Sequence, residues 1–135
     1  MEQEIPTAAK TILVVEDDKF FADLITRQFV AEGLHVVHAT SGEDGLEKMA
    51  GCRPNLITVD LALPGISGLE FIAKLSQKPE TKSIPFMVFS NSDEKEMRQE
   101  SNDLGAVGYF VKAQFTPREL CEKVTEFLAK KAKAI

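Results

Sequence analysis

The sequence has little of what marks disulfide-stabilised, zinc-binding or membrane-spanning proteins. Its 135 residues include only two cysteines. Cys52 and Cys121 lie far apart and form no Cys-x-x-Cys pair, so they indicate neither a disulfide framework nor a zinc site. No apolar run approaches the roughly 20 residues that cross a bilayer, and the opening MEQEIPTAAK lacks the apolar core of a signal peptide. These features predict a cytoplasmic protein that does not bind membranes.

Positive charge is also scarce. The chain has 16 Lys and Arg residues against 21 Asp and Glu residues, which gives a formal net charge of −5 at pH 7. Nucleic-acid binding without sequence preference depends on clustered Lys and Arg. The basic cluster at 130–133 is interpreted as a solvated helix end, which the helix dipole favours. We therefore expect no nucleic-acid partner.

What the sequence does contain is typical of one globular domain. Apolar residues make up 44% and charged residues 27% of the chain, an ordinary balance, and 135 residues leave little room for a second domain. We predict a flexible N-terminal lead at 1–10, a domain at 11–131 and a short C-terminal tail at 132–135. We expect no output domain.

Short apolar segments alternate with amphipathic segments throughout this domain. Five apolar segments are predicted strands, at 11–15, 35–39, 56–60, 84–90 and 107–111. Five amphipathic segments are predicted helices, at 18–32, 41–50, from 67 through 75, 93–104 and 116–131. The alternation predicts βαβ units with right-handed crossovers. The fold class is therefore α/β, with a doubly wound, five-stranded parallel sheet and helices on both faces.

The starts of two helices carry capping signals. Thr116 with Glu119 fits a capping box, and Pro117 suits the first turn. Asp17 and Asp18 both precede the first helix, and either acid could serve as its N-cap. We assign the cap to Asp18, which leaves Asp17 for chemistry.

Polar side chains follow four of the predicted strands. Glu16 and Asp17 come after the first strand, Asp60 and Ser90 end the third and fourth, and Lys112 follows the fifth. In an open parallel sheet, ligands bind outside the carboxyl ends of the strands, where the strand order reverses. If the first and third strands are neighbours, the three acids converge on one pocket rimmed by Ser90 and Lys112.

Three carboxylates held together repel one another strongly. Two charges about 4 Å apart cost about 4 kcal/mol at an effective dielectric near 20, so such a cluster takes up a proton or binds a cation. Oxygen ligands favour a hard ion such as Mg²⁺. His35 and His38 do not add ligands together, since an odd spacing puts them on opposite faces of a strand. With a lysine and a hydroxyl nearby, the pocket suits phosphoryl transfer to a carboxylate.

The chain resembles the receiver domains of bacterial two-component response regulators, and it looks most like the stand-alone, chemotaxis-regulator type. The resemblance covers residue 11 to about 131. The matching segments are VVEDD at 14–18, DLALPGISGLEF at 60–71, FSNSD at 89–93 and GYFVKAQFTPREL at 108–120. The spacing agrees too, because Ser90 follows Asp60 by 90 − 60 = 30 positions and Lys112 by 112 − 60 = 52.

This resemblance implies the flavodoxin-like strand order 2-1-3-4-5 and a magnesium site. Asp60 would be the phosphoryl acceptor. Glu16 and Asp17 would hold the ion together with Asp60, Asp17 as the closer ligand, and Ala62 would add its backbone carbonyl. The phosphoryl group would come from a histidine kinase or a phosphotransfer protein.

The resemblance also implies a switch. Ser90 would be the switch hydroxyl, Lys112 would pair with the phosphoryl group, and Tyr109 would swing inward on activation. A downstream protein would bind the fourth helix, fifth strand and fifth helix, at about 93–131. The domain would act as a signalling module with slow autodephosphorylation, and not as an enzyme.

The chain departs from the family pattern at three positions. Ala113 follows Lys112 where the family usually has a proline, often in cis, which predicts a trans peptide bond and a different placement of Lys112. Asn91 stands where the family usually has Ala or Gly. Ala62 stands where a polar residue or Met is frequent, and its small side chain leaves that side of the pocket open to water.

Two other functions stay open at this point. A magnesium-dependent phosphatase with an aspartyl nucleophile would use the same acids, but such enzymes usually have a second Asp where Ala62 stands. A degenerate receiver would signal by protein contact alone. Intact Asp60, Asp17 and Lys112 favour the phosphorylated module over both.

Overall fold

The computed structural model describes residues 9–133, and it describes side chains through residue 131. The strands are β1 (Thr11–Val15), β2 (His35–Ala39), β3 (Leu56–Val59), β4 (Phe86–Ser90) and β5 (Gly108–Val111). The helices are α1 (Lys19–Ala31), α2 (Gly42–Cys52), α3 (Gly68–Ser76), α4 (Lys95–Asp103) and α5 (Pro117–Lys133), and the 3-10 turn η1 (Lys112–Gln114) precedes α5. Within this part of the chain, no helix is both long and apolar enough to cross a membrane.

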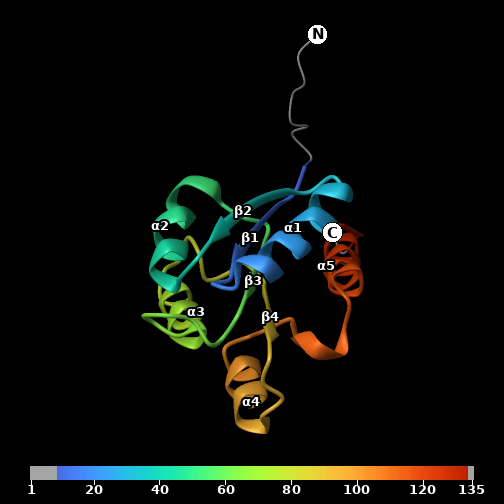
Figure 1. The fold of residues 1–135 in the computed structure, drawn as a ribbon. Helices are drawn as coiled ribbons and strands as arrows, with labels where there is room; N and C mark the ends of the chain where they lie inside the picture. Colours follow the sequence, from blue (N-terminus) through green and yellow to red (C-terminus); the bar gives the residue numbers. More distant parts are fainter. Residues whose placement is uncertain (1–8, 134–135) are drawn as a thin grey trace.

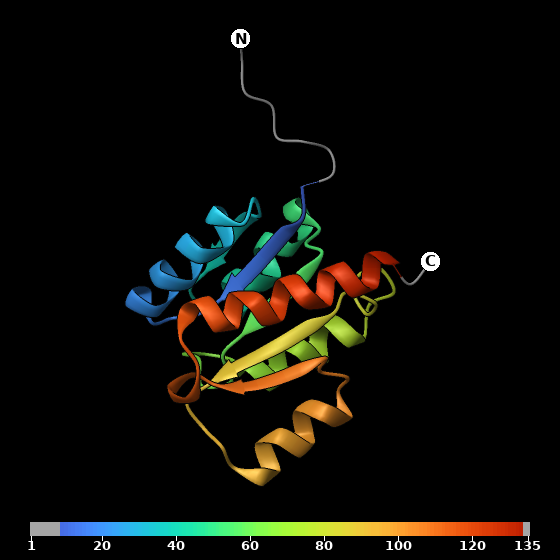
Figure 2. The same cartoon turned by 90° about the vertical axis from the view of Figure 1, so that its right-hand side faces the viewer.

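The five strands form one parallel sheet in the order β2-β1-β3-β4-β5. This confirms the predicted flavodoxin-like order. Helices α1 and α5 cover one face of the sheet, and α2, α3 and α4 lie on the other (Figures 1 and 2). The order reverses at the neighbouring strands β1 and β3, which is the place where this kind of sheet binds ligands.

Alternate residues of each strand pack on opposite faces of the sheet. In β1, Leu13 and Val15 join the core beneath α2 and α3, whereas Ile12 and Val14 join the core beneath α1 and α5. A side-chain period of two requires this division. Because both faces are covered, the central strands β3 and β4 are buried along their whole length.

Four element boundaries differ from the prediction by two residues, and one of them is the end of α2, which lies at Cys52 and not at residue 50. Strand β4 begins at Phe86, since Pro85 has no N–H to give to the ladder. Helix α4 begins at Lys95, because Glu94 takes the N-cap position with extended backbone. Helix α5 continues to Lys133. Residues 1–8 of the predicted lead and residues 134–135 of the predicted tail lie outside the described residues.

Candidate functional site

The backbone fixes two of the acids at the C-terminal edge of the sheet. The N–H of Glu16 donates to the carbonyl of Ala39 at 2.9 Å, and the N–H of Asp60 donates to the carbonyl of Val15 at 3.1 Å. Each acid therefore extends the parallel ladder by one residue beyond its strand. Their side chains leave the sheet side by side, at the point where the strand order reverses.

The structure brings three carboxylates together here, as the strand ends predict. Glu16, Asp17 and Asp60 each offer an oxygen within 4.8 Å of the other two. Glu16 and Asp60 are buried, while Asp17 is exposed at the mouth. The predicted cap is also confirmed, because Asp18 accepts a hydrogen bond from the N–H of Phe21 at 3.1 Å and starts α1.

Lys112 reaches into this acidic pocket from the end of β5. Its Nζ lies 2.8 Å from Glu16 Oε1 and 3.0 Å from Asp60 Oδ2, so one ammonium bridges both buried acids. The described residues contain no cis peptide bond, and the Lys112–Ala113 bond is trans. The chain after β5 forms the single 3-10 turn η1, with Ala113 where the family usually has proline. In this conformation Lys112 remains in contact with Asp60.

The pKa of Glu16 and the pKa of Lys112 are both raised, but for different reasons. Burial, reinforced by the charge of Asp60, raises the pKa of Glu16 to about 7, although the hydrogen bond from Lys112 opposes the change. Burial alone would lower the pKa of Lys112, but its hydrogen bonds and ion pairs with Glu16 and Asp60 outweigh burial and raise that pKa. The lysine therefore stays charged between the two buried acids.

Ser90 and Tyr109 are joined by one loop residue. Ser90 is buried at the end of β4, and its Oγ accepts a hydrogen bond from the N–H of Ser92 at 3.0 Å. The Tyr109 hydroxyl donates to the carbonyl of Ser92 at 2.7 Å. The guanidinium of Arg98 lies 4.7 Å from the centroid of the Tyr109 ring. The predicted switch residues thus share a partner, Ser92, which sequence reasoning did not identify.

Ala62 and Asn91, two of the three atypical positions, both lie at the surface. Ala62 is exposed, and its N–H donates to Asp60 Oδ1 at 3.1 Å, which orients that carboxylate. Asn91 is exposed beside the buried Ser90. Gly68 closes the loop behind Asp60, since a Cβ at this glycine would overlap the Asp60 carbonyl oxygen and approach Leu61 Cα to 2.7 Å.

Two further contacts to the pocket were not predicted. His38 Nε2 lies 2.8 Å from the carbonyl oxygen of Glu16, and the Phe21 ring lies beneath the ammonium of Lys112. Helical spacing predicts that Phe21 lies in one core stripe with Ile25 and Phe29, which follow it at i+4 and i+8. The latter two are fully buried, but Phe21 is only half-buried, at the rim. No sequence signal singles out Phe21, since Phe20 in the same turn is an equally large aromatic and is 74% exposed.

The donor set fits magnesium. All three grouped ligands are carboxylates, the atoms that a hard divalent ion prefers. Burial disfavours the charged form of Glu16, and a bound cation would offset that cost.

Comparisons with known proteins identify the family. The family model described as response regulator receiver domain matches residues 12–125. The phosphate regulon transcriptional regulatory protein PhoB of Rhizobium meliloti is 33% identical over 117 residues, which is 87% of this chain and 51% of that protein. Sporulation initiation phosphotransferase F of Bacillus subtilis is 30% identical over 90% of this chain and 95% of that protein.

A solved structure gives the same result. The CheY-like response regulator receiver domain protein of Methanospirillum hungatei superposes with a TM-score of 0.84 at 28% identity, over 93% of this chain and 98% of that one. The chain spans about half the length of the first PhoB relatives that it matches.

The fold and the pocket together define a doubly wound α/β domain with an acidic site where its strand order reverses. The chain belongs to the response regulator receiver domains of two-component systems. Domains of this family are signalling modules that receive a phosphoryl group from histidine kinases on an aspartate, bind Mg²⁺ at an acidic site and act on downstream partners.

Proposed function

We propose that this chain accepts a phosphoryl group on Asp60 from a histidine kinase or phosphotransfer protein, and that the modification changes its partner-binding face. The observation that carries the proposal is the bridge made by the Lys112 ammonium, 2.8 Å from Glu16 and 3.0 Å from Asp60, within the acidic pocket. The similarity to a phosphotransferase over 95% of that protein's length supports the same reaction.

The reaction needs little beyond positioning and charge neutralisation. A carboxylate oxygen of Asp60 forms a bond to phosphorus while the donor's bond to phosphorus breaks, and the electron pair of that bond leaves with the donor. Lys112 pairs with the new phosphoryl oxygens, and the Ser90 hydroxyl donates its hydrogen to another. Mg²⁺, held by Glu16, Asp17, Asp60 and the carbonyl of Ala62, would supply further neutralisation of phosphoryl charge.

The loop contacts support a route from the pocket to the partner face. When Ser90 turns toward the phosphoryl group, its Oγ leaves the N–H of Ser92, with which it now bonds at 3.0 Å. The same residue holds the Tyr109 hydroxyl through its carbonyl. Loss of the first bond therefore loosens the second, and Tyr109 becomes free to move inward. The outcome is a population shift in α4, β5 and α5.

Incubation with acetyl phosphate and Mg²⁺, followed by intact mass, tests this function. We expect the parent chain to gain one phosphoryl group and Asp60→Asn to gain none. Asp103→Asn serves as the matched control, since it removes an exposed acid of α4. A gain that persists in Asp60→Asn, or a parent chain that gains nothing, contradicts the proposal. Rapid turnover of the donor without accumulation would favour the phosphatase.

A further inference from the structure

Lys112 has a third partner, which is not an acid. Its Nζ lies 4.4 Å from the centroid of the Phe21 ring, and its side chain is only 8% exposed. An ammonium over the face of an aromatic ring is attracted by the ring quadrupole, and the attraction is strongest where the cation has lost its water. The carboxylates and the ring therefore contact one poorly hydrated cation.

The ring that makes this contact is itself held in place. Phe21 packs edge-on against Phe89, with centroids 6.4 Å apart. Phe89 packs in the same way on Phe110 at 6.2 Å, and Phe110 packs on Phe115 at 5.4 Å. Such edge-to-face pairs are the favoured aromatic geometry. Phe21 on α1 is thus fixed through β4 and β5, and does not lie loose on the rim.

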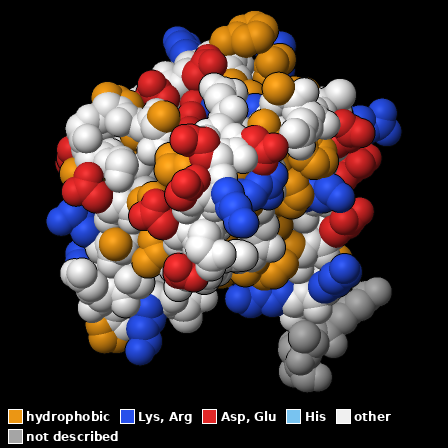
Figure 3. All heavy atoms as spheres, turned by 90° about the horizontal axis from the view of Figure 1, so that it is seen from below, with side chains coloured by type: hydrophobic (Ala, Val, Ile, Leu, Met, Phe, Trp, Pro, Cys, Tyr) orange, Lys and Arg blue, Asp and Glu red, His pale blue; other side chains and the backbone are white. Residues whose placement is uncertain are grey.

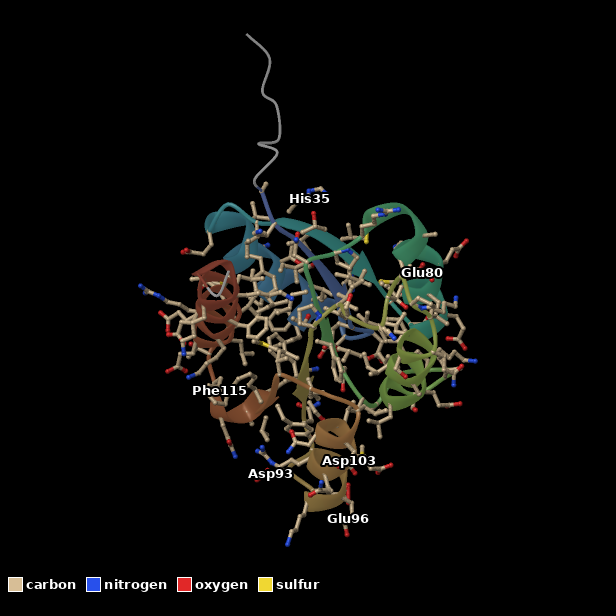
Figure 4. All side chains as sticks on the ribbon, turned by 180° about the vertical axis from the view of Figure 1, so that it is seen from behind. His35, Glu80, Asp93, Glu96, Asp103 and Phe115 are labelled. Atoms are coloured by element: carbon tan, nitrogen blue, oxygen red, sulfur yellow. The ribbon has the colours of Figure 1, made fainter. Side chains whose placement is uncertain are left out.

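The row of rings from Phe21 to Phe115 ends at a residue that also contacts Lys112. Phe115 directly follows the turn η1 that begins with Lys112, and its N–H donates to the Lys112 carbonyl at 3.3 Å. Figure 4 shows Phe115 where this connection meets the start of α5. The ammonium of Lys112 contacts the Phe21 ring and its carbonyl contacts the backbone of Phe115, the residues at the two ends of the row. These contacts restrain a side chain whose four-carbon stem is otherwise flexible.

We propose that Phe21 is a positioning residue for phosphoryl transfer, because the face of its ring holds the Lys112 ammonium in the acidic pocket. The inference rests on the proposed function. As the phosphoryl group arrives, the charge that Lys112 must meet moves from Asp60 to the phosphoryl oxygens. The ring attracts the ammonium through its quadrupole and not through a directed N–H···O bond, so this contact can persist while the donor that now bonds Asp60 turns to a phosphoryl oxygen. Correct placement of such a group contributes directly to the rate.

Fluorination of Phe21 separates this role from simple packing. Replacing Phe21 by 4-fluoro-, 3,5-difluoro- and 3,4,5-trifluorophenylalanine withdraws electron density from the ring face with little change of size. We expect the rate of phosphorylation by acetyl phosphate with Mg²⁺ to fall stepwise, by about tenfold in total at the trifluoro ring. Phe21→Trp should keep most of the rate, and Phe21→Leu should lose it as the trifluoro ring does.

Phe29 provides the matched control on the same helix. It is fully buried in the core beneath α1 and α5, and among the described residues no cation lies over its ring. The same fluorinated series at Phe29 should leave the rate unchanged. Thermal unfolding of every variant shows whether the fold is intact. The inference would be overturned if the phosphorylation rate fell equally with added fluorine at the two positions, or if it did not fall at Phe21.

The proton NMR spectrum of the unphosphorylated chain provides a second test, through the chemical shift of the Lys112 ε-methylene protons. The ring face should shift the Lys112 ε-methylene protons upfield, and Phe21→Leu should remove that shift. An absent shift in the parent chain would also overturn the inference. If the parent is phosphorylated on Asp60 but the fluorinated series is flat, only the role of Phe21 fails. If the parent gains no phosphate at all, the proposed function fails as well.

Discussion

Helices α4 and α5 lie on opposite faces of the sheet near β5, but they are built very differently. Helix α5 begins with a reciprocal capping box, in which Thr116 and Glu119 each accept a hydrogen bond from the other's N–H. Among its described side chains, through residue 131, it buries four that are apolar: Leu120, Cys121, Val124 and Leu128. Helix α4 has no side-chain cap at Glu94, and the one residue that it buries fully is Ser101.

The two helices also differ in where they lie on the molecule. Figure 2 shows α5 lying across the sheet and α4 standing at the margin of the molecule. Glu96 and Asp103 lie on that outlying helix (Figure 4), and acidic side chains gather on the face of the molecule seen from below (Figure 3). Segments with few buried contacts open locally at low free energy. The comparison indicates that α5 is the fixed part of the proposed partner face and α4 the movable part.

The largest expected difference between the two helices concerns stability. Leu120 is fully buried in α5, whereas Met97 of α4 is half-buried. Leu120→Ala should lower the free energy of unfolding by about 2–5 kcal/mol, and Met97→Ala by only about 1 kcal/mol, because less buried surface is lost. Urea unfolding followed by circular dichroism measures both. Equal losses would contradict the view that α5 is more firmly anchored in the core than α4.

The sequence pattern predicts the sheet and the acidic pocket well, for a physical reason. Alternating apolar and amphipathic segments determine a βαβ topology, and in a parallel sheet the residues after β1 and β3 must meet at one edge. Glu16 and Asp60 could therefore be placed together without coordinates. The same logic located Lys112, although the route through η1 was not foreseen.

Contacts between side chains on different strands and helices could not be predicted from the sequence. Helical spacing assigned Phe21 to the inner face of α1, but spacing does not distinguish the rim of a core from its centre. The neighbour of Phe21 depends on how far Lys112 reaches, which is a tertiary property. In the same way, the bond from His38 to the Glu16 carbonyl follows from the register of β1 against β2. A period of two does not reveal register.

The rate at which a buried thiol reacts with a labelling reagent measures how readily each helix opens. Cys121 is buried in α5, and burial, aided by the charges of Glu32 and Glu122, raises its pKa to about 11. Ser101→Cys, in a chain with Cys52→Ser and Cys121→Val, places an equivalent buried thiol in α4. We expect this probe to react at least about tenfold faster than Cys121 in a Cys52→Ser chain, a difference of about 1.4 kcal/mol in opening. Similar rates would mean that the two helices open together.

A new N-cap should reduce the contrast between the helices. Glu94→Asp places a shorter, preferred capping side chain at the start of α4, and it should stabilise the helix by about 1 kcal/mol. Hydrogen exchange at the amides of Glu96 and Met97 should slow about fivefold. In α5, Thr116→Ala should do the opposite by removing an existing cap. If exchange in α4 does not respond to Glu94→Asp, its missing cap is not what makes the helix movable.

The smallest predicted effect concerns Arg98, which links α4 to the ring of Tyr109. Its guanidinium lies 4.7 Å from the ring centroid, and its Nε is 2.8 Å from Asp93 Oδ1. Such a stack at a partly exposed site contributes about 0.5–1 kcal/mol. Arg98→Ala should therefore shift the Tyr109 ring about two- to fivefold toward its inward position before any phosphorylation.

The chain offers an unusually direct probe for this shift. Tyr109 is its one tyrosine, and it has no tryptophan, so tyrosine fluorescence or the ¹⁹F signal of 3-fluorotyrosine reports on position 109 alone. Beryllofluoride with Mg²⁺, as a phosphoryl mimic, defines the activated end point. Arg98→Ala should move the signal part of the way there, and Arg98→Lys should move it less, because lysine keeps the charge but loses the planar stack. An unchanged signal in Arg98→Ala would show that the Tyr109 hydroxyl bond to Ser92 suffices to hold the ring, so that control of the switch lies in the β4–α4 loop and not in α4 itself.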